Sequence, residues 1–503
     1  MSFALPTELV CLARAFAEAG VRLYGVGGMV RNPLLGLPVS DMDITSDLRP
    51  EGVMALCRDK GLACVPKGLA FGMVEIHAGA CVFEHTTFRA DTYGPGGGHR
   101  PTAVAFSDTV EADAFRRDFT VNALYQDILG GAILDPTGGL ADLKAGLLRA
   151  TGPEPGRIMG EDALRVLRLA RFSAELGFAP EGNTLASAKA HAAGLRDISA
   201  ERVREELRRV LLSPEKYGRA GAVYRGLSLL DALGALDVVL PELTKGRGVP
   251  QRAQYHAYDV LGHCLHAADC ASADCAPADC APAGCASADC APAGCASAGC
   301  APADCAPDGA LALRLAALLH DVGKPVALAQ YGRMLQHDKL GAPIAAAALT
   351  RLRYPNALVE EVRAMVAGHM FDLDGRAKEG TLRRKFVEWG YGFSRQMARL
   401  RRADVLGSGR NGSVATADRW EAVLAAMKAE GAPFTEAELA ISGRELMEAL
   451  GLPPGPAVGR IKRALLMHCA KKPQDNTPRR LVRLARDIGA REAGGLDMKP
   501  PPS

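Results

Sequence analysis

The spacing of apolar and polar residues changes near residue 150. Before that point, short β-rich runs separated by glycines and helical stretches predict strands at residues 23–26, 42–45, 73–77 and 81–87. Beyond it, apolar residues recur at helical spacing, as in EDALRVLRLARF (161–172) and SAERVREELRRVLLSP (199–214). The pattern predicts an α/β head with a mixed β-sheet and helices, followed by an all-α remainder, and hence a multidomain α+β protein.

The length of 503 residues exceeds the size at which one hydrophobic core stops growing, so several domains are expected. The pattern divides the chain into a head at 1–150, a helical neck at 151–245, a helical body at 246–410 and a helical tail at 411–503. The body contains a low-complexity insertion at 269–309, in which a unit of Ala, Pro or Ser, Asp or Gly, and Cys repeats every five residues. A disordered insertion, a soft-metal site and a short β-solenoid all remain open for that repeat.

Charge and cysteine content bear on the possible partners of the protein and on its cellular compartment. The formal net charge of +3 neither requires nor excludes a nucleic-acid partner. Lys and Arg are in excess at residues 376–410 and 460–491, and such stretches either follow a phosphate backbone or are solvated helix faces. No N-terminal signal or membrane-spanning apolar run is visible, so we expect a cytosolic protein with free thiols and no membrane partner.

The segment GGMVRNPLLGLPVSDMDITS (27–46) combines glycines, an arginine and paired aspartates. Residues two apart in a strand share one face, so Asp41 and Asp43 are predicted to project together. Oxygen ligands at that spacing suit Mg2+. Gly27 and Gly28 allow close backbone approach to a phosphate at the start of a short helix, and Arg31 adds a positive charge.

In these residues the chain resembles the class II tRNA nucleotidyltransferases and bacterial poly(A) polymerases, which share a nucleotidyltransferase head. Segment 27–46 is similar to the family's GGxxRD…DxD signature. Further similar segments follow in the family's order at 83–89, 116–124, 134–143, 161–172 and 198–207. One departure is Asn32, which stands where the family has Asp and would keep a hydrogen bond but lose a charge.

The resemblance implies roles for the matching residues. Asp41 and Asp43 would hold Mg2+, with Glu84 as a supporting third carboxylate. Two ions about 4 Å apart would activate an RNA hydroxyl and neutralise the leaving pyrophosphate. Arg117 and Asp118 would contact the ribose. The nucleotide-binding residues implied are Gly27, Gly28, Arg31, Arg117, Asp118, Asn122, Asp162, Arg165, Arg168 and Arg171.

The choice of base is predicted to depend on Asp162 and Arg165. On a continuous helix they would share one face and meet one flat partner. Cytosine and adenine present an amine donor beside a ring-nitrogen acceptor, which a carboxylate and a guanidinium complement, whereas uracil and guanine present the reverse. Each mispaired polar group would cost about 1–3 kcal/mol, so the pair would select CTP and ATP. The alternative is an ordinary surface ion pair.

A second set of chemical residues lies in the predicted body. His and Asp recur in segments 255–268, 317–325, 336–342, 366–370 and 401–407 at a spacing that resembles the HD phosphohydrolase superfamily. This resemblance implies phosphatase or phosphodiesterase action, although such helices also persist as scaffolds. Imidazole with carboxylate favours Mn, Fe, Co, Ni or Zn. The implied metal ligands are His263, His320, Asp321 and Asp404, with His337 and His369 completing a two-metal version.

These features predict an Mg2+-dependent enzyme that adds CCA to tRNA 3′ ends from CTP and ATP. A poly(A) polymerase, or an enzyme limited to CC or A addition, carries the same motifs and remains open. An HD phosphohydrolase with an RNA-binding head would predict damaged head carboxylates, but both are present. The tail segment 441–466 also resembles the family and would bring Arg460, Lys462 and Arg463 near an RNA phosphate, unless it is a plain helical hairpin.

Overall fold

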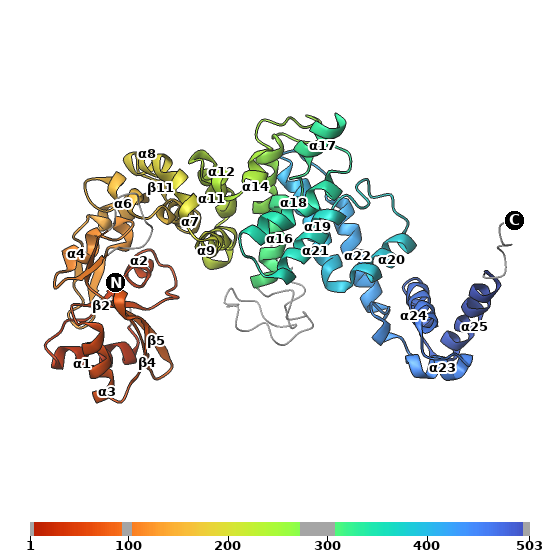
Figure 1. The fold of residues 1–503 in the computed structure, drawn as a ribbon, viewed down its shortest axis with the longest axis horizontal. Coiled ribbons are helices and arrows are strands. Elements are labelled where there is room, and N and C mark those ends of the chain that lie inside the picture. The colour runs from red at the N-terminus through yellow and green to blue at the C-terminus, as the bar shows by residue number, and fades with distance from the viewer. Residues whose placement is uncertain (1–4, 93–102, 272–306, 496–503) are drawn as a thin grey trace. The chain divides into compact units, whose positions relative to one another are not determined.

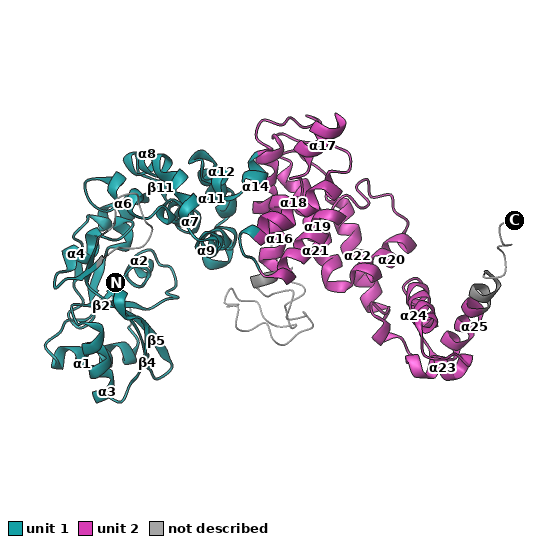
Figure 2. Cartoon of the chain, in the orientation of Figure 1, with its two compact units in different colours: residues 1–244, 351–354 teal, residues 245–350, 355–503 magenta. Residues whose placement is uncertain are grey.

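The computed structural model describes residues 5–92, 103–271 and 307–495, so most of the cysteine repeat lies outside the described residues. The chain divides into two compact units (Figure 2). Unit 1 comprises residues 1–244 and 351–354, and unit 2 comprises residues 245–350 and 355–503. Unit 1 contains a mixed β-sheet followed by helices, and the described residues of unit 2 are helical. The predicted fold class is therefore confirmed.

Seven strands of unit 1 form one sheet in the order β3-β4-β5-β2-β1-β8-β9 (Figure 1). Strands β2 and β5 run parallel, and the other neighbouring pairs run antiparallel. The four strands predicted from the sequence correspond to β1, β2, β4 and β5, within one residue at each end. The strand bounds are β1 (Tyr24–Val26), β2 (Asp43–Ser46), β3 (Ala63–Gly68), β4 (Met73–Ala78), β5 (Cys81–Thr87), β8 (Tyr125–Asp127) and β9 (Ile133–Leu134).

One face of the sheet is covered by helices α1 (Thr7–Glu18) and α3 (Pro50–Asp59), which contact β3 and β4. Residues alternate between buried and half-buried along β4, as expected for a strand with one face in a core. Leu9, Leu12 and Phe16 follow helical spacing on α1 and are buried in the same cluster as Ile76 and Phe83. This core fixes β2 and β5, and with them the predicted catalytic carboxylates.

The remaining elements of unit 1 are two separate two-stranded sheets and the other helices. Helix α2 (Gly28–Leu34) follows β1 directly, and helices α6 (Pro155–Glu161) and α7 (Leu164–Leu176) begin the helical part. The other bounds are β6 (Arg89–Thr92), β7 (Ala103–Phe106), α4 (Val110–Phe115), α5 (Gly139–Ala145), β10 (Leu147–Leu148), β11 (Ala179–Pro180), α8 (Gly182–His191), α9 (Ala200–Leu211), α10 (Ser213–Tyr217), α11 (Ala222–Ala232), α12 (Ala235–Val239) and α13 (Pro241–Thr244).

Unit 2 packs its helices around the predicted HD segments. None of the helices in the described ranges is both long and apolar enough to cross a membrane. The helix bounds are α14 (Val260–Cys270), α16 (Pro307–Leu319), α17 (Lys324–Tyr331), α18 (His337–Arg351), α19 (Asn356–Gly368), α20 (Glu379–Trp389), α21 (Tyr391–Gly407), α22 (Ala415–Ala429), α23 (Gly443–Leu450), α24 (Pro456–Cys469) and α25 (Pro478–Gly495), with the end of α18 belonging to unit 1.

Candidate functional site

Unit 1 contains a cavity of about 390 Å3 whose lining combines acidic and many basic side chains. Of the residues predicted for the head site, all but Glu84 line it. They come from segments up to 144 positions apart, between Gly27 and Arg171, which the fold brings to one place. The lining residues that the sequence predicted are Gly27, Gly28, Arg31, Asp41, Asp43, Arg117, Asp118, Asn122, Asp162, Arg165, Arg168 and Arg171.

Two carboxylates, Asp41 and Asp43, line one wall of this cavity, and a third, Glu84, lies beside Asp43 in the sheet. Asp43 begins β2 and pairs in register with Glu84 of β5. Asp41 lies before the strand rather than within it, where Ser40 donates a hydrogen bond to its carboxylate at 3.1 Å. The pKa of Asp43 is raised, chiefly by burial and also by the charges of Glu84 and Asp41, although Arg117 opposes the shift. Oxygen donors under mutual repulsion are suited to bind a divalent cation.

Gly27 brings the backbone close to these carboxylates. Its φ is +65°, a conformation that other residues rarely adopt. A Cβ atom at this position would lie 3.5 Å from Oδ2 of Asp43. The glycine therefore allows the turn between β1 and α2 to pass beside the carboxylate wall.

Asn32 is the residue at which the sequence departs from the family pattern. Its side-chain oxygen accepts a hydrogen bond from Nη2 of Arg31 at 2.9 Å. Its side-chain nitrogen donates to the carbonyl of Pro38 at 2.8 Å and to the hydroxyl of Tyr217 at 3.0 Å. An ionised carboxylate could not donate either of these bonds, so the amide links α2 to α10 in a way that Asp would not.

Asp118 is the centre of a buried polar network. Nη2 of Arg168 lies 2.6 Å from its Oδ2, and Oδ1 accepts hydrogen bonds from Asn122 and from the backbone of Phe119. Burial alone would raise the pKa of Asp118, but Arg168 and these hydrogen bonds lower it to about 2. Arg31 donates in turn to Asn122. The network therefore joins α7 to α2 through a carboxylate that stays ionised.

Arg117 is held by partners that the sequence analysis did not identify. Its Nε donates to the hydroxyl of Tyr125 at 2.9 Å, and its Nη2 lies 2.9 Å from Oδ2 of Asp113. Asp113 is buried and also accepts from Arg116. The position of Arg117 at the cavity wall is thus fixed by Asp113 and Tyr125, which do not themselves line the cavity.

The structure corrects one geometric prediction. Asp162 and Arg165 do not share a face of one helix, because α6 ends at Glu161, Asp162 is extended and α7 begins at Leu164. Asp162 accepts from the backbone of Leu164 at 3.0 Å, a local hydrogen bond that competes with a continuous helix. Both side chains still line the same cavity.

The hydrogen-bond and ion-pair partners of Asp162 and Arg165 come from both sides of the break between α6 and α7. Oδ2 of Asp162 lies 2.6 Å from Nη2 of Arg202 on α9. Arg165 donates to the backbone carbonyl of Ile158 at 2.6 Å and pairs with Glu161 at 2.9 Å. Each group is therefore anchored by a different neighbour, which fixes the carboxylate and the guanidinium independently.

Several cavity residues were missed by the sequence analysis because long-range folding brings them there. Arg202, Arg209, Lys216 and Tyr217 come from α9 and α10 and line the cavity. The amphipathic spacing of α9 gave a signal for the helix, but no local pattern indicates which of its arginines faces a cavity whose earlier lining residues lie at least 30 positions before it in sequence.

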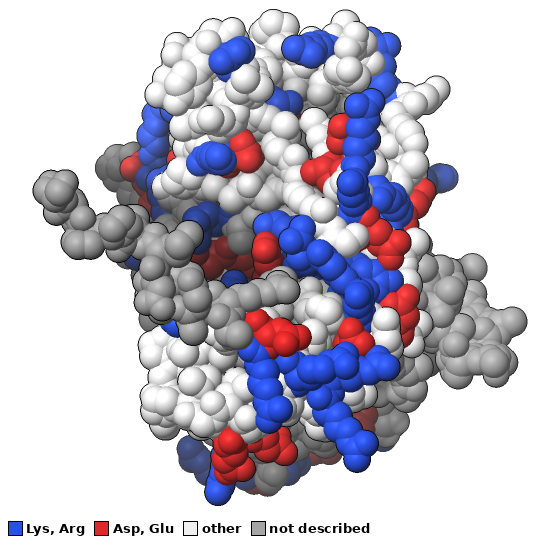
Figure 3. Space-filling view, turned by 90° about the vertical axis from the view of Figure 1, so that its right-hand side faces the viewer, with Lys and Arg blue, Asp and Glu red and all other residues white. Residues whose placement is uncertain are grey.

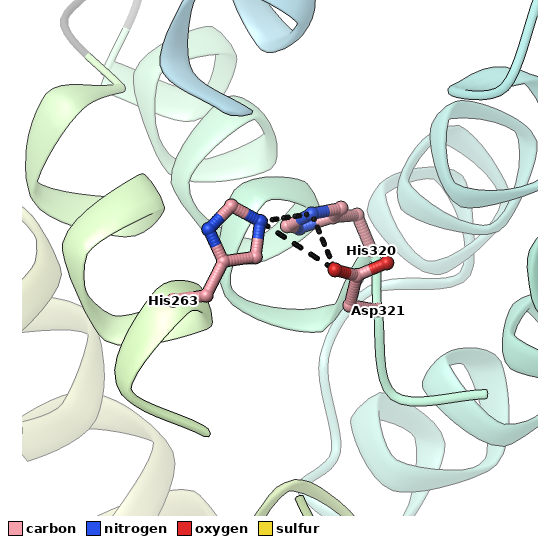
Figure 4. Close-up of side chains that lie close together, drawn as sticks. All are labelled: His263, His320 and Asp321. Atoms are coloured by element: carbon pink, nitrogen blue, oxygen red, sulfur yellow. Dashed lines mark hydrogen bonds and ion pairs between the residues drawn. The ribbon is translucent and has the colours of Figure 1, made fainter. Parts of the chain in front are cut away.

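In unit 2 the predicted HD residues form one cluster, of which Figure 4 shows the buried side chains His263, His320 and Asp321. His263 comes from α14, while His320 and Asp321 follow α16 directly. The Nε2 atoms of His263 and His320 are 3.0 Å apart. Oδ1 of Asp404, on α21, lies 3.1 Å from His263 and 3.5 Å from His320. All four predicted ligands therefore converge on one point.

His337 and His369 form a second group on the other side of Asp321. Their Nε2 atoms are 3.0 Å apart, and Oδ1 of Asp321 lies 3.1 Å from His337 and 3.8 Å from His369. Oδ2 of Asp321 faces His320 instead, at 3.2 Å. The two oxygens of one carboxylate therefore face two different groups of imidazoles.

The charges of the cluster shift the pKa values of two of its histidines in opposite directions. Burial would lower the pKa of His320, but the charges of Asp321 and Asp404 raise it to about 10. Burial combined with the nearby His320 lowers the pKa of His369 to about 4. Both carboxylates have pKa values well below the usual range despite their burial, because imidazoles and Lys324 stabilise the ionised form.

Beside the cluster lies a cavity of about 450 Å3 that two further cations line. Lys324 contacts Oδ2 of Asp321 at 2.5 Å and donates to Gln251 at 2.6 Å. Arg401 pairs with Oδ2 of Asp404 at 2.9 Å. Both residues lie in segments that the sequence analysis singled out, 317–325 and 401–407, but neither was predicted as a site residue.

Helices α14 and α21 approach closely beside this cluster. Nδ1 of His263 donates to the carbonyl of Gly407 at 3.2 Å. A Cβ atom at Gly407 would lie only 2.5 Å from the backbone of Ala267, so no larger residue fits without a shift. This junction seats His263 opposite Asp404.

A groove of about 580 Å3 lies between α20 and α24 of unit 2. Its rim carries Arg384, Lys385, Arg460 and Arg463 against one acid, Glu388, and its floor is apolar. The side of the molecule on which Figure 1 draws α24 and α25 carries clusters of Lys and Arg with Asp and Glu between them (Figure 3). Lys462, which the sequence grouped with its neighbours, does not line the groove, whose lining is Phe371, Thr381, Arg384, Lys385, Glu388, Arg460, Arg463, Ala464 and Met467.

Comparison with known families matches three parts of the chain. Residues 23–149 match the poly A polymerase head domain, and residues 177–246 match the family described as the probable RNA- and SrmB-binding site of polymerase A. Residues 306–406 match the HD domain. Both the head and the HD domain imply divalent metal ions.

Individual proteins extend these matches over most of the chain. The A-adding tRNA nucleotidyltransferase of Deinococcus radiodurans is 33% identical over 453 residues, which is 88% of this chain and 89% of that protein. The CCA-adding enzyme of Limosilactobacillus fermentum is 40% identical over 260 residues, or 49% of this chain and 60% of that protein. The crystal structure of the Bacillus stearothermophilus CCA-adding enzyme in complex with CTP shares the fold, with a TM-score of 0.67 and 23% identity over 98% of this chain and 100% of that one.

Proposed function

The chain belongs to the tRNA nucleotidyltransferase family, and on that basis we propose that it completes the CCA terminus of tRNA from CTP and ATP. The observation that carries the proposal is the single cavity in which the carboxylate wall of Asp41 and Asp43 meets a cluster of arginines. Acidic groups that attract cations, beside basic groups that attract a triphosphate, are the parts that phosphoryl transfer between nucleotides needs.

The residues of the cavity divide the work of the reaction. Asp41 and Asp43 would hold Mg2+, with Glu84 supporting them, and the bound ions would supply activation of the RNA 3′-hydroxyl and neutralisation of the leaving group. The new bond joins the 3′-oxygen to the α-phosphorus, and the bond from that phosphorus to pyrophosphate breaks. Arg168 and Arg117, fixed by Asp118 and Asp113, would orient the nucleotide.

Base selection is proposed for Asp162 and Arg165. Although they come from two sides of a helix break, both are at the cavity wall and both are anchored. A fixed acceptor beside a fixed donor complements the edges of cytosine and adenine and opposes those of uracil and guanine. Anchoring matters because a mobile side chain would rotate to accommodate the wrong base.

A second candidate is addition of the terminal A alone. The relative that spans 88% of this chain is an A-adding tRNA nucleotidyltransferase, whereas the CCA-adding enzyme of Limosilactobacillus fermentum spans 49% of it. The residues at the cavity are compatible with either extent of addition, because both reactions use the same transfer step. Full CCA addition and addition of the terminal A alone are distinguished by the RNA end that the enzyme accepts.

The test is to incubate the purified protein and Mg2+ with tRNA that lacks CCA, or that ends in CC, and with each labelled triphosphate in turn. We expect C, C and A to be added in order and addition to stop. Addition of A only to the CC end would establish the second candidate, and long A tails would establish a poly(A) polymerase.

A carboxylate variant shows whether the cavity performs the reaction. Asp43→Ala is expected to reduce incorporation by at least about 1,000-fold, because the ion site loses the half-buried carboxylate that begins β2. Asp59→Ala, which changes an exposed acid of α3, is the control and should behave as wild type. Unchanged incorporation by Asp43→Ala would refute the proposal.

The substrate RNA would also contact unit 2. The groove between α20 and α24 carries four cations against one acid, and its apolar floor could receive a sugar or base face. We propose that a phosphate backbone of the tRNA lies along this groove.

The HD cluster supports a second activity, hydrolysis of phosphate esters. The supporting observation is the convergence of His263, His320, Asp321 and Asp404, beside a cavity that Lys324 lines. Nitrogen and oxygen donors together favour Mn, Fe, Co, Ni or Zn. A His320→Ala, Asp321→Ala double variant should lose hydrolysis of 2′,3′-cyclic or 2′-phosphate ends while nucleotide transfer persists. Retained hydrolysis would refute the activity at this site.

A cytoplasmic location is proposed on the state of the thiols. The seven cysteines of the described residues are free, as expected in a reducing compartment.

A further inference from the structure

We infer that Asn32 is a determinant of triphosphate affinity, because it leaves Arg31 as a buried cation whose counter-charge is the triphosphate of the incoming nucleotide. The inference deepens the nucleotidyl transfer proposed above and rests on it only for the identity of the anion. It concerns a residue at which this chain departs from the family signature, so it does not follow from membership of the family.

Arg31 differs from the other cations that line the head cavity. Each of the others has a carboxylate partner at 2.5–3.8 Å, whereas Arg31 has no ion pair among the residues that the structure describes. The pairs are Arg89 with Asp91, Arg116 and Arg117 with Asp113, Arg165 with Glu161, Arg168 with Asp118, Arg171 with Glu206, Arg202 with Asp162, Arg209 with Glu205, and Lys216 with Glu175.

The contacts of the Arg31 guanidinium are with neutral groups. Its Nε and Nη2 donate to Oδ1 of Asn32 at 3.2 and 2.9 Å, and its Nη1 donates to Oδ1 of Asn122. The ring of Phe172, whose centroid lies 5.2 Å from Cζ, is neutral as well. Arg31 is 3% exposed, and a guanidinium stays protonated in proteins. Its hydrogen bonds are therefore satisfied while its charge is buried without a counter-charge, which is costly.

The amide of Asn32 decides whether Arg31 has an internal counter-charge. A guanidinium only donates, so the atom of Asn32 that faces it must be the oxygen. If this residue were Asp, the same oxygen would carry negative charge at 2.9 and 3.2 Å from two guanidinium nitrogens and would form an ion pair. The family residue would thus neutralise Arg31 within the protein, and the asparagine does not.

Glu175 is the carboxylate whose charge acts on Arg31 from a greater distance. It raises the pKa of Arg31, but burial outweighs it and the pKa is lowered, with Arg171 contributing in the same direction as burial. Oε2 of Glu175 already lies 3.1 Å from Arg171 and 3.8 Å from Lys216. One carboxylate shared with two nearer cations leaves a positive potential at Arg31.

The position of Arg31 identifies the anion. A Cβ atom at Gly28 would lie 3.8 Å from Nη2 of Arg31, and one at the adjacent Gly27 would lie 3.5 Å from Oδ2 of Asp43. The guanidinium therefore lies near the carboxylate wall that is proposed to hold Mg2+. Ions at such a wall bind the phosphates of a nucleotide, and a guanidinium binds phosphate oxygens in pairs.

The alternative is that Asn32 only fixes the local structure. Its Nδ2 donates to the carbonyl of Pro38 and to the hydroxyl of Tyr217, so a substitution would also loosen α2 from α10. That role predicts weaker binding of every part of the nucleotide. An effect of charge predicts weaker binding of the phosphates alone.

The experiment measures inorganic triphosphate and adenosine as competitors of ATP on the full-length protein with Mg2+ and without RNA. ATP is used because addition of CCA and of the terminal A alone both require it. Asn32→Asp should bind inorganic triphosphate about tenfold more weakly than wild type and adenosine equally well. Asn32→Ser removes the same hydrogen bonds without adding a charge and should lose less triphosphate affinity than Asn32→Asp. The control is Asn183→Asp, which makes the same change at an exposed position of α8 outside the cavity.

Steady-state incorporation separates the triphosphate from the RNA as the source of the anion. In Asn32→Asp, KM for ATP should rise about tenfold, while kcat and KM for tRNA stay within about threefold of wild type. If Asn32→Asp does not fold, Arg31→Gln replaces it and should lose inorganic triphosphate, but not adenosine, by at least tenfold.

Several results would overturn the inference. These are unchanged triphosphate affinity in folded Asn32→Asp, equal losses in Asn32→Asp and Asn32→Ser, an equal loss of adenosine, or a rise in KM for tRNA instead of ATP. The proposed function fails separately. Competition by inorganic triphosphate that depends on residue 32, in a protein that incorporates no nucleotide into tRNA, would refute the function and leave the anion site standing.

Discussion

Replacing Arg171 by methionine tests whether this arginine acts on nucleotide or on stability. It lines the cavity, yet its guanidinium is only 3% exposed. Its Nε lies 2.6 Å from Oε2 of Glu206 on α9, and its Nη1 lies 3.1 Å from Oε2 of Glu175 on its own helix. These two carboxylates are 6% and 1% exposed, so the arginine is enclosed by charge partners that join α7 to α9.

The expected cost follows from what the substitution leaves behind. Breaking a buried ion pair by removing one partner costs about 3–5 kcal/mol, because the remaining charge is buried without compensation. Here Lys216 lies 3.8 Å from Glu175, and Arg168 lies 3.8 Å from Glu206, so each carboxylate keeps a distant cation. We therefore take the lower end, about 3 kcal/mol. For a unit of this size that corresponds to a fall in Tm of about 6–12 °C.

The assay uses an internal reference supplied by the sequence. Both tryptophans of the chain, Trp389 and Trp420, lie in unit 2, so tryptophan fluorescence reports unfolding of unit 2. Calorimetry should show a transition lowered by about 6–12 °C in Arg171→Met, while the fluorescence transition stays within about 2 °C of wild type. Arg196→Met changes an exposed arginine of unit 1 and should alter stability by about 0.5 kcal/mol or less.

A calorimetric shift below about 2 °C would refute the reasoning, because the enclosed carboxylates would then tolerate the loss of their arginine. A further variant that also carries Glu175→Gln and Glu206→Gln should recover part of the loss, since the unpaired charges are removed. No recovery would show that the packing of the arginine stem, rather than its charge, stabilises the contact between α7 and α9.

Three further predictions concern binding, fidelity and acid stability. Arg463→Glu in the groove should raise KM for tRNA about tenfold, lower the slope of log KM against log salt by about one, and leave KM for CTP unchanged. The control is Lys462→Glu on the same helix, which should have a smaller effect because Lys462 does not line the groove. Equal effects of the two variants would contradict tRNA binding in the groove. Arg202→Gln removes the partner 2.6 Å from Asp162 and should raise misincorporation of UTP about tenfold in single-turnover assays; unchanged fidelity would contradict this. The pKa of Asp118 is lowered to about 2, so its contribution to stability is present above about pH 4 and is lost as the pH falls toward 2. In calorimetric scans from pH 5 to 2, the Tm of Asp118→Asn should therefore fall less steeply with decreasing pH than the Tm of wild type. An equally steep fall in both proteins would contradict this prediction.

The resemblance of short segments to a known family was sufficient to predict most of the residues that the structure brings to the head cavity. The glycines, aspartates and arginines of that site are spaced in short segments, and strand alternation located β2 and β5 within one residue. The break at Asp162 was missed because apolar residues keep helical spacing on both sides of it. The available signal was the Asp itself, a residue that hydrogen-bonds nearby backbone and favours helix starts.

Residues whose role depends on distant contacts could not be found in this way. Tyr217 lies opposite Asn32 although 185 positions separate them in sequence, and no periodicity encodes that contact. Asp113 supports Arg117 from a short helix whose acidic residues resemble an ordinary first turn. For the same reason the resemblance to the HD superfamily implied six residues for one site, but it did not predict that the two oxygens of Asp321 would face different histidines.

Because Gly407 packs directly against Ala267, the geometry of the HD cluster does not depend on the length of the chain between α14 and α16. Because α14 is seated directly on α21, the position of His263 is set by a contact between helices and not by the connection from Cys270 to Pro307. A change in the number of repeat units is therefore expected to leave the positions of His263 and Asp404 relative to each other unchanged. Natural selection would then preserve Gly407, whereas the length of the repeat could change.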